Sequence, residues 1–326
     1  KEADYICVLD TGSTDGTFEK LKEKGIITKQ KKYKNFRFDI ARNASMSLIP
    51  LDTDICVCVD LDEVFNTGWA DIVRKSWNTD TTGARYRYTW NFNPDGSEGV
   101  VFLLDKIHKT NTYFWKHPVH EVLTPISSTK ENYITLPIQL SHYADNTKSR
   151  SSYLPLLELA VKEDPKDDRN MHYLGREYLF YGQYNKAIKT LEKHLTLEKS
   201  TWDLERCASL RYIAQCYKHL NKPKLQETFL LKAICEANYI REPYYELAVF
   251  YYERKQYLKA IVFFNEMLKI NERQLNYMSS PICWSETPYD YLSICYYEIG
   301  DIKKAIKNVK KLTQILNIQF KNQNFS

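Results

Sequence analysis

The sequence has 326 residues, enough for two domains with separate cores, and its 43% hydrophobic and 27% charged residues are typical of globular proteins. The net charge of +5 is small and lies along helix-like segments of the second half, so it does not call for a nucleic-acid partner. No apolar run is long enough to form a transmembrane segment, and no signal peptide opens the sequence.

The eight cysteines form no CxxC pair and no group with histidines at the spacing of a zinc site. Cys7, Cys56 and Cys58 lie in apolar runs and have the pattern of small buried hydrophobic residues. We therefore expect free thiols, a reducing compartment and a cytoplasmic protein.

The first half alternates predicted strands, turns and helices. Residues 5–10 form a short apolar run that ends in Asp10, a turn-rich stretch follows at 11–17, and a helix is expected from 18 to 24. This order is typical of doubly wound α/β domains. Further segments are expected as a helix at 40–48, a buried strand at 55–60, and strands at 84–92, 99–104 and 133–142.

From about residue 151 the period becomes helical, and one pattern recurs four times. A small residue returns at intervals of 39, 34 and 45 residues, as Gly175, Ala214, Ala248 and Ser293. This pattern resembles the tetratricopeptide repeat, in which small residues let paired helices approach closely. Gln226 departs from the pattern, and the longest interval predicts an insertion at 274–287.

Three carboxylates lie at the end of the predicted strand at 55–60 and directly after it, in the run Asp60-Leu61-Asp62-Glu63. Carboxylates two residues apart at the end of a strand can converge on one divalent cation. The alternative interpretation is an acidic surface turn.

Five segments together resemble family 2 glycosyltransferases of the GT-A fold. They are residues 8–17, 38–43, 60–63, the segment from Trp115 to Glu121, and Ser141-His142-Tyr143. The resemblance implies two domains. Residues 1–150 would form an α/β domain of the Rossmann-like GT-A fold, which binds a nucleotide sugar, and residues 151–326 would form an all-α domain of tetratricopeptide-type repeats. It also implies a strand and helix ahead of Asp4, so we expect either an upstream segment or an incomplete donor site.

The resemblance assigns nucleotide-binding roles to the first two segments. Asp10, with Thr11 and Gly12, would contact the base or ribose of a UDP-sugar, whereas the alternative role for Asp10 is a capping residue of the turn. Asp15 would brace this loop. Arg42 would contact phosphate or base edges, and its alternative is a solvated helix residue.

The resemblance also implies a metal site. Asp60 would face the ribose or a metal-bound water, and Asp62 would bind Mn²⁺ or Mg²⁺ bridging the diphosphate of the donor. His142 would complete the coordination, although a lone histidine is more often structural.

An inverting transferase also needs a base to deprotonate the acceptor. The candidates are Glu121 and, second, Asp105. The alternative for Glu121 is a surface ion pair with Lys116 or Lys109.

Two functions therefore compete. The first is an inverting, metal-dependent hexosyltransferase that moves a sugar from a UDP donor to a glycan or polypeptide acceptor, with the repeats binding the acceptor or forming a homodimer. The second is a catalytically weak or inactive transferase-like scaffold, whose helical repeats bind a partner. A basic and aromatic stretch at 29–37 suggests nucleic acid only weakly, and a solvated connection explains it better.

Overall fold

The computed structural model describes residues 2–93, 95–144 and 152–323, and the chain divides into two units. The first unit comprises Lys1–Asn91 and Val101–Glu163, and the second comprises Phe92–Val100 and Asp164–Ser326. The domain boundary expected at residue 150 lies outside the described residues.

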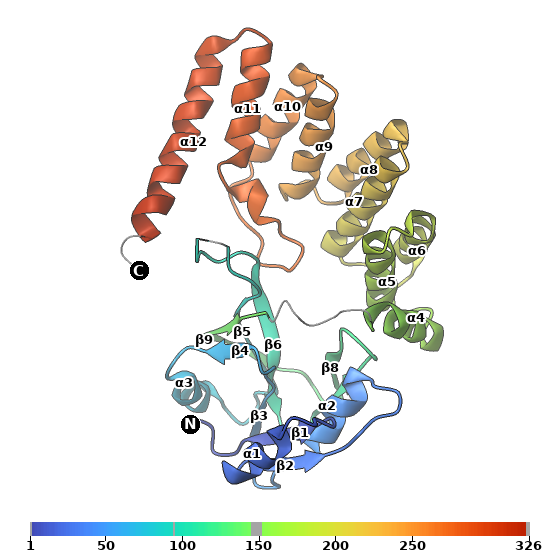
Figure 1. The fold of residues 1–326 in the computed structure, drawn as a ribbon, viewed down its shortest axis with the longest axis vertical. Helices are drawn as coiled ribbons and strands as arrows, with labels where there is room; N and C mark the ends of the chain where they lie inside the picture. The colour runs from blue at the N-terminus through green and yellow to red at the C-terminus, as the bar shows by residue number, and fades with distance from the viewer. Residues whose placement is uncertain (1, 94, 145–151, 324–326) are drawn as a thin grey trace. The chain divides into compact units, whose positions relative to one another are not determined.

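A five-stranded sheet forms the centre of the first unit (Figure 1). In spatial order its strands are β3 (Ile55–Val57), β6 (Val101–Lys109), β5 (Gly83–Thr89), β9 (Tyr133–His142) and β4 (Glu63–Phe65). Only the pair β5–β9 is parallel, and the other neighbours are antiparallel.

The core of the first unit lies along the central strands β5, β6 and β9. Tyr86, Ile107 and Leu140 are fully buried there, and Val73 of helix α3 (Trp69–Ser76) packs against them. Apolar side chains alternate along the strands with more exposed ones, so one face of the sheet supplies this cluster.

The N-terminal strand lies outside this sheet. β1 (Cys7–Asp10) pairs in parallel with β2 (Ile27–Gln30) across helix α1 (Thr17–Glu23), as a separate two-stranded sheet. Helix α2 (Phe38–Met46) packs on β1 and on β7 (Tyr113–Lys116), which pairs with β8 (Val122–Pro125). Helix α4 (Tyr153–Glu163) completes the described part of this unit.

The strand pairing corrects the expected fold class. A Rossmann-like domain requires the first strand to belong to a mainly parallel sheet with crossover helices. Among the described residues β1 pairs with β2 alone, and the larger sheet is antiparallel except for β5–β9. The described residues therefore form a mixed sheet with small flanking sheets, together with a helical unit, and not a GT-A Rossmann-like domain followed by a repeat domain.

Helices stacked in consecutive pairs make up most of the second unit (Figure 1). The first helices of the pairs are α5 (Asp168–Phe180), α7 (Asp203–His219), α9 (Glu242–Glu253) and α11 (Thr287–Glu298). The second helices are α6 (Tyr184–Thr196), α8 (Pro223–Glu236), α10 (Tyr257–Leu268) and α12 (Ile302–Gln323). The small residues Gly175, Ala214, Ala248 and Ser293 each lie in a first helix.

The segment between α10 and α11 folds over neighbouring helices. It contains a short 3-10 helix, Pro281–Trp284, and its polar groups bind residues of earlier pairs. Tyr277 donates a hydrogen bond to Glu205 at 2.8 Å, and the backbone N–H of Ser280 donates to Glu242 at 2.7 Å. The sequence predicted an insertion here, and the structure shows that it covers the ends of α7 and α9.

No helix in the part of the chain that the structure describes is both long and apolar enough to cross a membrane.

The closest helix approach in the first pair depends on Gly175. A Cβ at this position would lie 2.5 Å from Cγ and Cδ2 of Leu191, which is fully buried. We predict that Gly175→Ala lowers the free energy of unfolding by about 1–3 kcal/mol through overpacking. This is the opposite sign from the gain of about 1 kcal/mol expected for Gly→Ala in an ordinary helix.

Urea unfolding followed by circular dichroism measures this change. Ser293→Ala is the matched control, because it alters the same repeat position without adding volume, and we expect it to cost no more than about 1 kcal/mol. A stabilised Gly175→Ala variant would show that the helices are not in contact here.

Candidate functional site

An arginine–carboxylate cluster, defined here as Arg42, Asp60, Glu63, Lys106 and Glu121, gathers side chains from four separate segments of the first unit. Arg42 of α2 donates from Nη2 to Asp60 Oδ1 at 2.7 Å and from Nε to Glu121 Oε1. Lys106 Nζ of β6 lies 3.0 Å from Asp60 Oδ2 and 3.4 Å from Glu63 Oε1. Three carboxylates and two cations are therefore paired in one place.

The electrostatics of the cluster favour the charged forms. Burial by itself favours the protonated form of Asp60, but Lys106 and then Arg42 outweigh it and lower the pKa of its carboxyl group to about 2. Burial also opposes the charge of Arg42, yet Asp60 and Glu121 raise the pKa of its guanidinium above the usual value. Asp60 and Arg42 are therefore both charged at neutral pH.

Neighbouring groups hold the cluster in place. Asn43 clamps α2 to β7, because its side chain donates to Trp115 O at 2.7 Å and accepts from Trp115 N at 2.8 Å. The Arg42 guanidinium lies over the Trp115 ring, 4.8 Å from its centroid. His120, directly before Glu121, has a φ of 51°, a left-handed conformation that is uncommon outside glycine.

The structure brings together some of the predicted site residues. Arg42, Asp60 and Glu121 are in direct contact, and Glu121 pairs with Arg42 instead of Lys116 or Lys109. A separate contact joins Asp62 Oδ2 to His142 Nε2 at 3.5 Å, while His142 Nδ1 lies 2.8 Å from the carbonyl oxygen of Trp90. The roles expected for Asp60, Asp62 and His142 as metal ligands stay predictions.

The predicted nucleotide loop is held by its own side chains. Asp10 is buried, and its Oδ1 accepts hydrogen bonds from the backbone N–H groups of Gly12 and Ser13, each at 2.8 Å. Asp15 accepts from Thr17 N and Oγ1. Gly12 adopts a φ of 115°, and a Cβ there would lie 2.7 Å from Lys32 Cγ. The loop geometry therefore explains Asp10, Gly12 and Asp15 locally, and nucleotide binding by these residues and the exposed Thr11 stays a prediction.

Asp105, the second candidate base, is exposed on β6 directly before Lys106. Adjacent residues of a strand point to opposite faces, so Asp105 faces away from the side of the sheet on which Lys106 meets Asp60. Its expected catalytic role is also untested.

A second group of polar side chains lies in the helical unit and was not found from the sequence. Among the described residues, His172, His194 and Glu205 are the group of metal-ligating types whose donor atoms all lie within 4.8 Å of one another. We call them the His–Glu cluster. They come from α5, α6 and α7, and separations of 22 and 11 residues match no short metal motif.

Lys106 and Glu63 are the members of the arginine–carboxylate cluster to which sequence analysis gave no role. Glu63 was noticed only as part of an acidic run, and Lys106 belongs to a strand with no motif of its own. Alternation along the strand could have marked Lys106 as an inward-facing charge, but not its partner.

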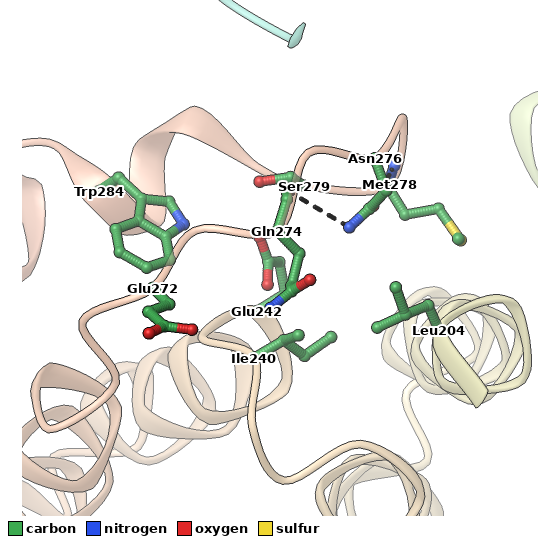
Figure 2. Close-up of a pocket in the computed structure, with 9 residues that line it drawn as sticks. All are labelled: Leu204, Ile240, Glu242, Glu272, Gln274, Asn276, Met278, Ser279 and Trp284. Atoms are coloured by element: carbon green, nitrogen blue, oxygen red, sulfur yellow. Dashed lines mark hydrogen bonds between the residues drawn. The ribbon is translucent and has the colours of Figure 1, made fainter. Parts of the chain in front are cut away.

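A small pocket beneath the segment between α10 and α11 is shown in Figure 2. Leu204, Ile240 and Glu242 lie on one side, with Gln274 and Asn276 of the covering segment above them. Its volume of about 10 Å³ is that of roughly one water molecule. It is too small for an organic ligand.

No family model and no curated protein matches the chain. Solved structures that are similar include MamA 41-end from Desulfovibrio magneticus RS-1, with 17% identity, a TM-score of 0.41, and coverage of 52% of this chain and 86% of that one. Pseudomonas aeruginosa PilF has 12% identity and a TM-score of 0.40, covering 52% and 70%. BtubC from P. vanneervenii has 18% identity and a TM-score of 0.43, covering 50% and 72%.

These findings correct the family assignment. The similar structures are helical proteins of the tetratricopeptide type and not GT-A glycosyltransferases. The identification as a family 2 glycosyltransferase, and with it the expected hexosyltransferase activity, is therefore withdrawn. The metal ion and the nucleotide-sugar donor remain untested predictions. With TM-scores below 0.5, no function passes from these proteins to this chain.

The charge balance of the arginine–carboxylate cluster is testable by titration. Lys106 is the strongest of the interactions that lower the pKa of Asp60 against the effect of burial. We therefore predict that in Lys106→Met the pKa of Asp60 rises from about 2 toward or above the unperturbed value of about 3.9. Carboxyl carbon chemical shifts measured by NMR against pH give this value directly.

The lowered pKa of Asp60 also makes the stability of the fold depend on pH. A depressed folded pKa means that Asp60 stabilises the fold above the unfolded pKa of about 3.9, and that this contribution is lost as the pH falls toward 2. Lys109→Met, on the same strand, is the control and leaves the titration of Asp60 unchanged. An unaltered Asp60 titration in Lys106→Met would contradict the ion pairing.

Proposed function

We propose that the protein is a helical-repeat scaffold that binds a protein partner through its last helix pair. The observation that supports this proposal is an exposed apolar stripe on α12, formed by Ile302, Ile306 and Val309. The spacing of four and then three residues places all three side chains on one side of the helix.

The stripe on α12 occupies positions whose counterparts in the earlier pairs are buried. Sixteen residues after the small residue of each first helix, the earlier second helices carry Leu191, Leu230 and Phe264, which are 0%, 2% and 0% exposed. The corresponding residue of α12, Val309, is 48% exposed. Thirteen residues after the small residue, Ile188 and Ile261 are 7% and 8% exposed, whereas Ile306 is 51% exposed.

The difference arises from the packing of successive pairs. α6, α8 and α10 each contact the first helix of the following pair as well as their own partner. Among the described residues, α12 is packed against α11 alone in this way. Its stripe is therefore the side on which a further helix would pack, and repeat arrays bury such faces against a neighbour or a partner.

The charges beside the stripe indicate the chemistry of the partner. Five lysines of α12 lie near it, at positions 303, 304, 307, 310 and 311, with no acid between them. α9 and α11, which pack on α8 and α10, contain glutamate or aspartate and no lysine or arginine. An amphipathic helix with acidic residues matches both the apolar stripe and its basic border.

A second copy of the chain fits this surface less well, because two α12 helices would bring their lysines together. The homodimer expected from the sequence stays a prediction. Sedimentation equilibrium distinguishes it from the proposed partner, since a dimer that dissociates on Ile306→Glu would favour self-association.

The test replaces two exposed residues at once, as Ile306→Glu with Val309→Glu. Proteins that bind the wild-type chain are first isolated from cells that express it and are identified. The protein that binds most tightly is then purified, and its affinity is measured by calorimetric titration. We expect the double variant to bind at least tenfold more weakly, about 1.4 kcal/mol, because burying two carboxylates in an apolar contact is costly.

Leu258→Glu is the matched control, since Leu258 is a 68% exposed apolar residue of another second helix. It should retain affinity, and all variants should keep the wild-type urea midpoint because the changed residues are exposed. Equal affinity of the double variant and the wild type would refute the proposed surface.

The cysteines support a cytoplasmic location for this scaffold. All eight are free thiols, and burial raises the pKa of Cys207 and of Cys216 to about 12, so these thiols stay protonated and unreactive. We expect eight alkylatable thiols per unfolded chain isolated with rapid acid quenching. Disulfide-linked cysteines in that measurement would place the protein in an oxidising compartment.

A further inference from the structure

The His–Glu cluster forms a continuous chain of polar contacts where α5, α6 and α7 meet. Ser209 Oγ lies 2.7 Å from His172 Nδ1 and 3.0 Å from His194 Nδ1. His194 Nε2 lies 3.4 Å from Glu205 Oε1 and 3.0 Å from Ser200 Oγ. All five side chains are buried.

One atom among these contacting side chains, Nε2 of His172, has no hydrogen-bond partner in the described residues. His172 Nε2 is fully buried, and no described polar group is within hydrogen-bonding distance of it. Leaving a buried polar atom unpaired costs about 1–3 kcal/mol, so a fold that keeps such an atom needs something to offset that cost.

Ser209 explains how both histidines can present free lone pairs. A serine oxygen has two acceptor sites, so it can accept an N–H from Nδ1 of His172 and from Nδ1 of His194 together. In this arrangement each imidazole carries its proton on Nδ1, which leaves the lone pair of each Nε2 available to a metal ion. Histidines that bind metals are usually fixed in this way, by a hydrogen bond from the other ring nitrogen.

A hydrogen bond likewise orients the carboxylate of Glu205. Its Oε2 accepts a hydrogen bond from Tyr277 at 2.8 Å, which orients the carboxylate and leaves Oε1 facing His194. Two imidazoles and one carboxylate are a common zinc-binding set. Bonds of roughly 2.0–2.1 Å place tetrahedral ligands about 3.4 Å apart, which agrees with the 3.4 Å between His194 Nε2 and Glu205 Oε1.

The surrounding charges set limits on the affinity. Arg169 and Arg176 lie one turn on either side of His172 along α5, and both stack on the Tyr173 ring. The same positive charges oppose a cation, and Glu205 alone among the three ligands compensates them.

We propose that His172, His194 and Glu205 bind one divalent transition-metal ion, zinc by the chemistry of its ligands, and that the ion ties α5, α6 and α7 together. Ser209 and Tyr277 act as positioning residues that hold the ligands, and Ser200 Oγ or a water supplies the fourth ligand. This site is independent of the partner surface on α12.

The experiment uses the full chain, stripped with a chelator and then refolded from urea with zinc chloride, because the site is closed to solvent. We expect one bound zinc per chain by elemental analysis and a higher thermal midpoint than the metal-free protein, since an ion that binds only the folded state stabilises it. Cobalt chloride in place of zinc should give the visible absorption of a tetrahedral site without thiolate ligands.

His172→Gln removes the unpartnered nitrogen and should abolish both the bound equivalent and the cobalt spectrum. Ser209→Ala keeps all three ligands and should weaken binding about 10- to 100-fold, which a purely structural serine would not do. His219→Gln is the matched control, because His219 is an exposed histidine of α7 outside the cluster. It should bind zinc as the wild type does.

Two results would overturn the proposal. One is a wild-type chain that binds no zinc and has an unchanged thermal midpoint, which would leave His172 Nε2 to a water molecule. The other is binding that persists in His172→Gln or shows a thiolate–cobalt spectrum, which would place the metal on cysteines. If His172→Gln fails to fold, the comparison of Ser209→Ala with the wild type decides between the outcomes.

Discussion

The pairing of poorly solvated charges across distant segments is the constraint on which both units depend. Arg42 meets Asp60 and Glu121, which lie 18 and 79 residues away in the sequence. In the helical unit the buried Arg211 of α7 pairs with Glu246 of α9 at 2.6 Å. Each pair compensates a desolvation cost only when the fold brings the two groups together, and losing one partner leaves an unpaired charge.

This constraint links the five-stranded sheet to helix α2, which packs on β1 and β7. α2 contributes Arg42 to the cluster and Asn43 to the clamp on Trp115, so neighbouring residues of one helix serve charge pairing and backbone hydrogen bonding. The motif at 38–43 therefore has a structural explanation within this unit. The same residues suggested a nucleotide site only by their resemblance to another family.

The helical unit depends on the close packing of helices at small residues. Small residues in the first helices permit the approach of their partners, and the side chains that follow at fixed spacing are buried between successive pairs. The pair α11–α12 repeats this spacing, but there Ile306 and Val309 are about half exposed. The polar contacts of His172, in contrast, are buried where α5, α6 and α7 meet.

The sequence by itself determined the local features: the positions of helices with small residues at a repeating phase, the turn around Asp10, and the insertion after α10. These depend on neighbouring residues, so periodicity and turn chemistry are sufficient to find them. It did not determine that β1 would pair outside the main sheet, and the motif order led to a wrong family. Only the tertiary structure placed Lys106 against Asp60 and His172 beside His194, because contacts between residues far apart in sequence are set by packing and leave no short-range pattern.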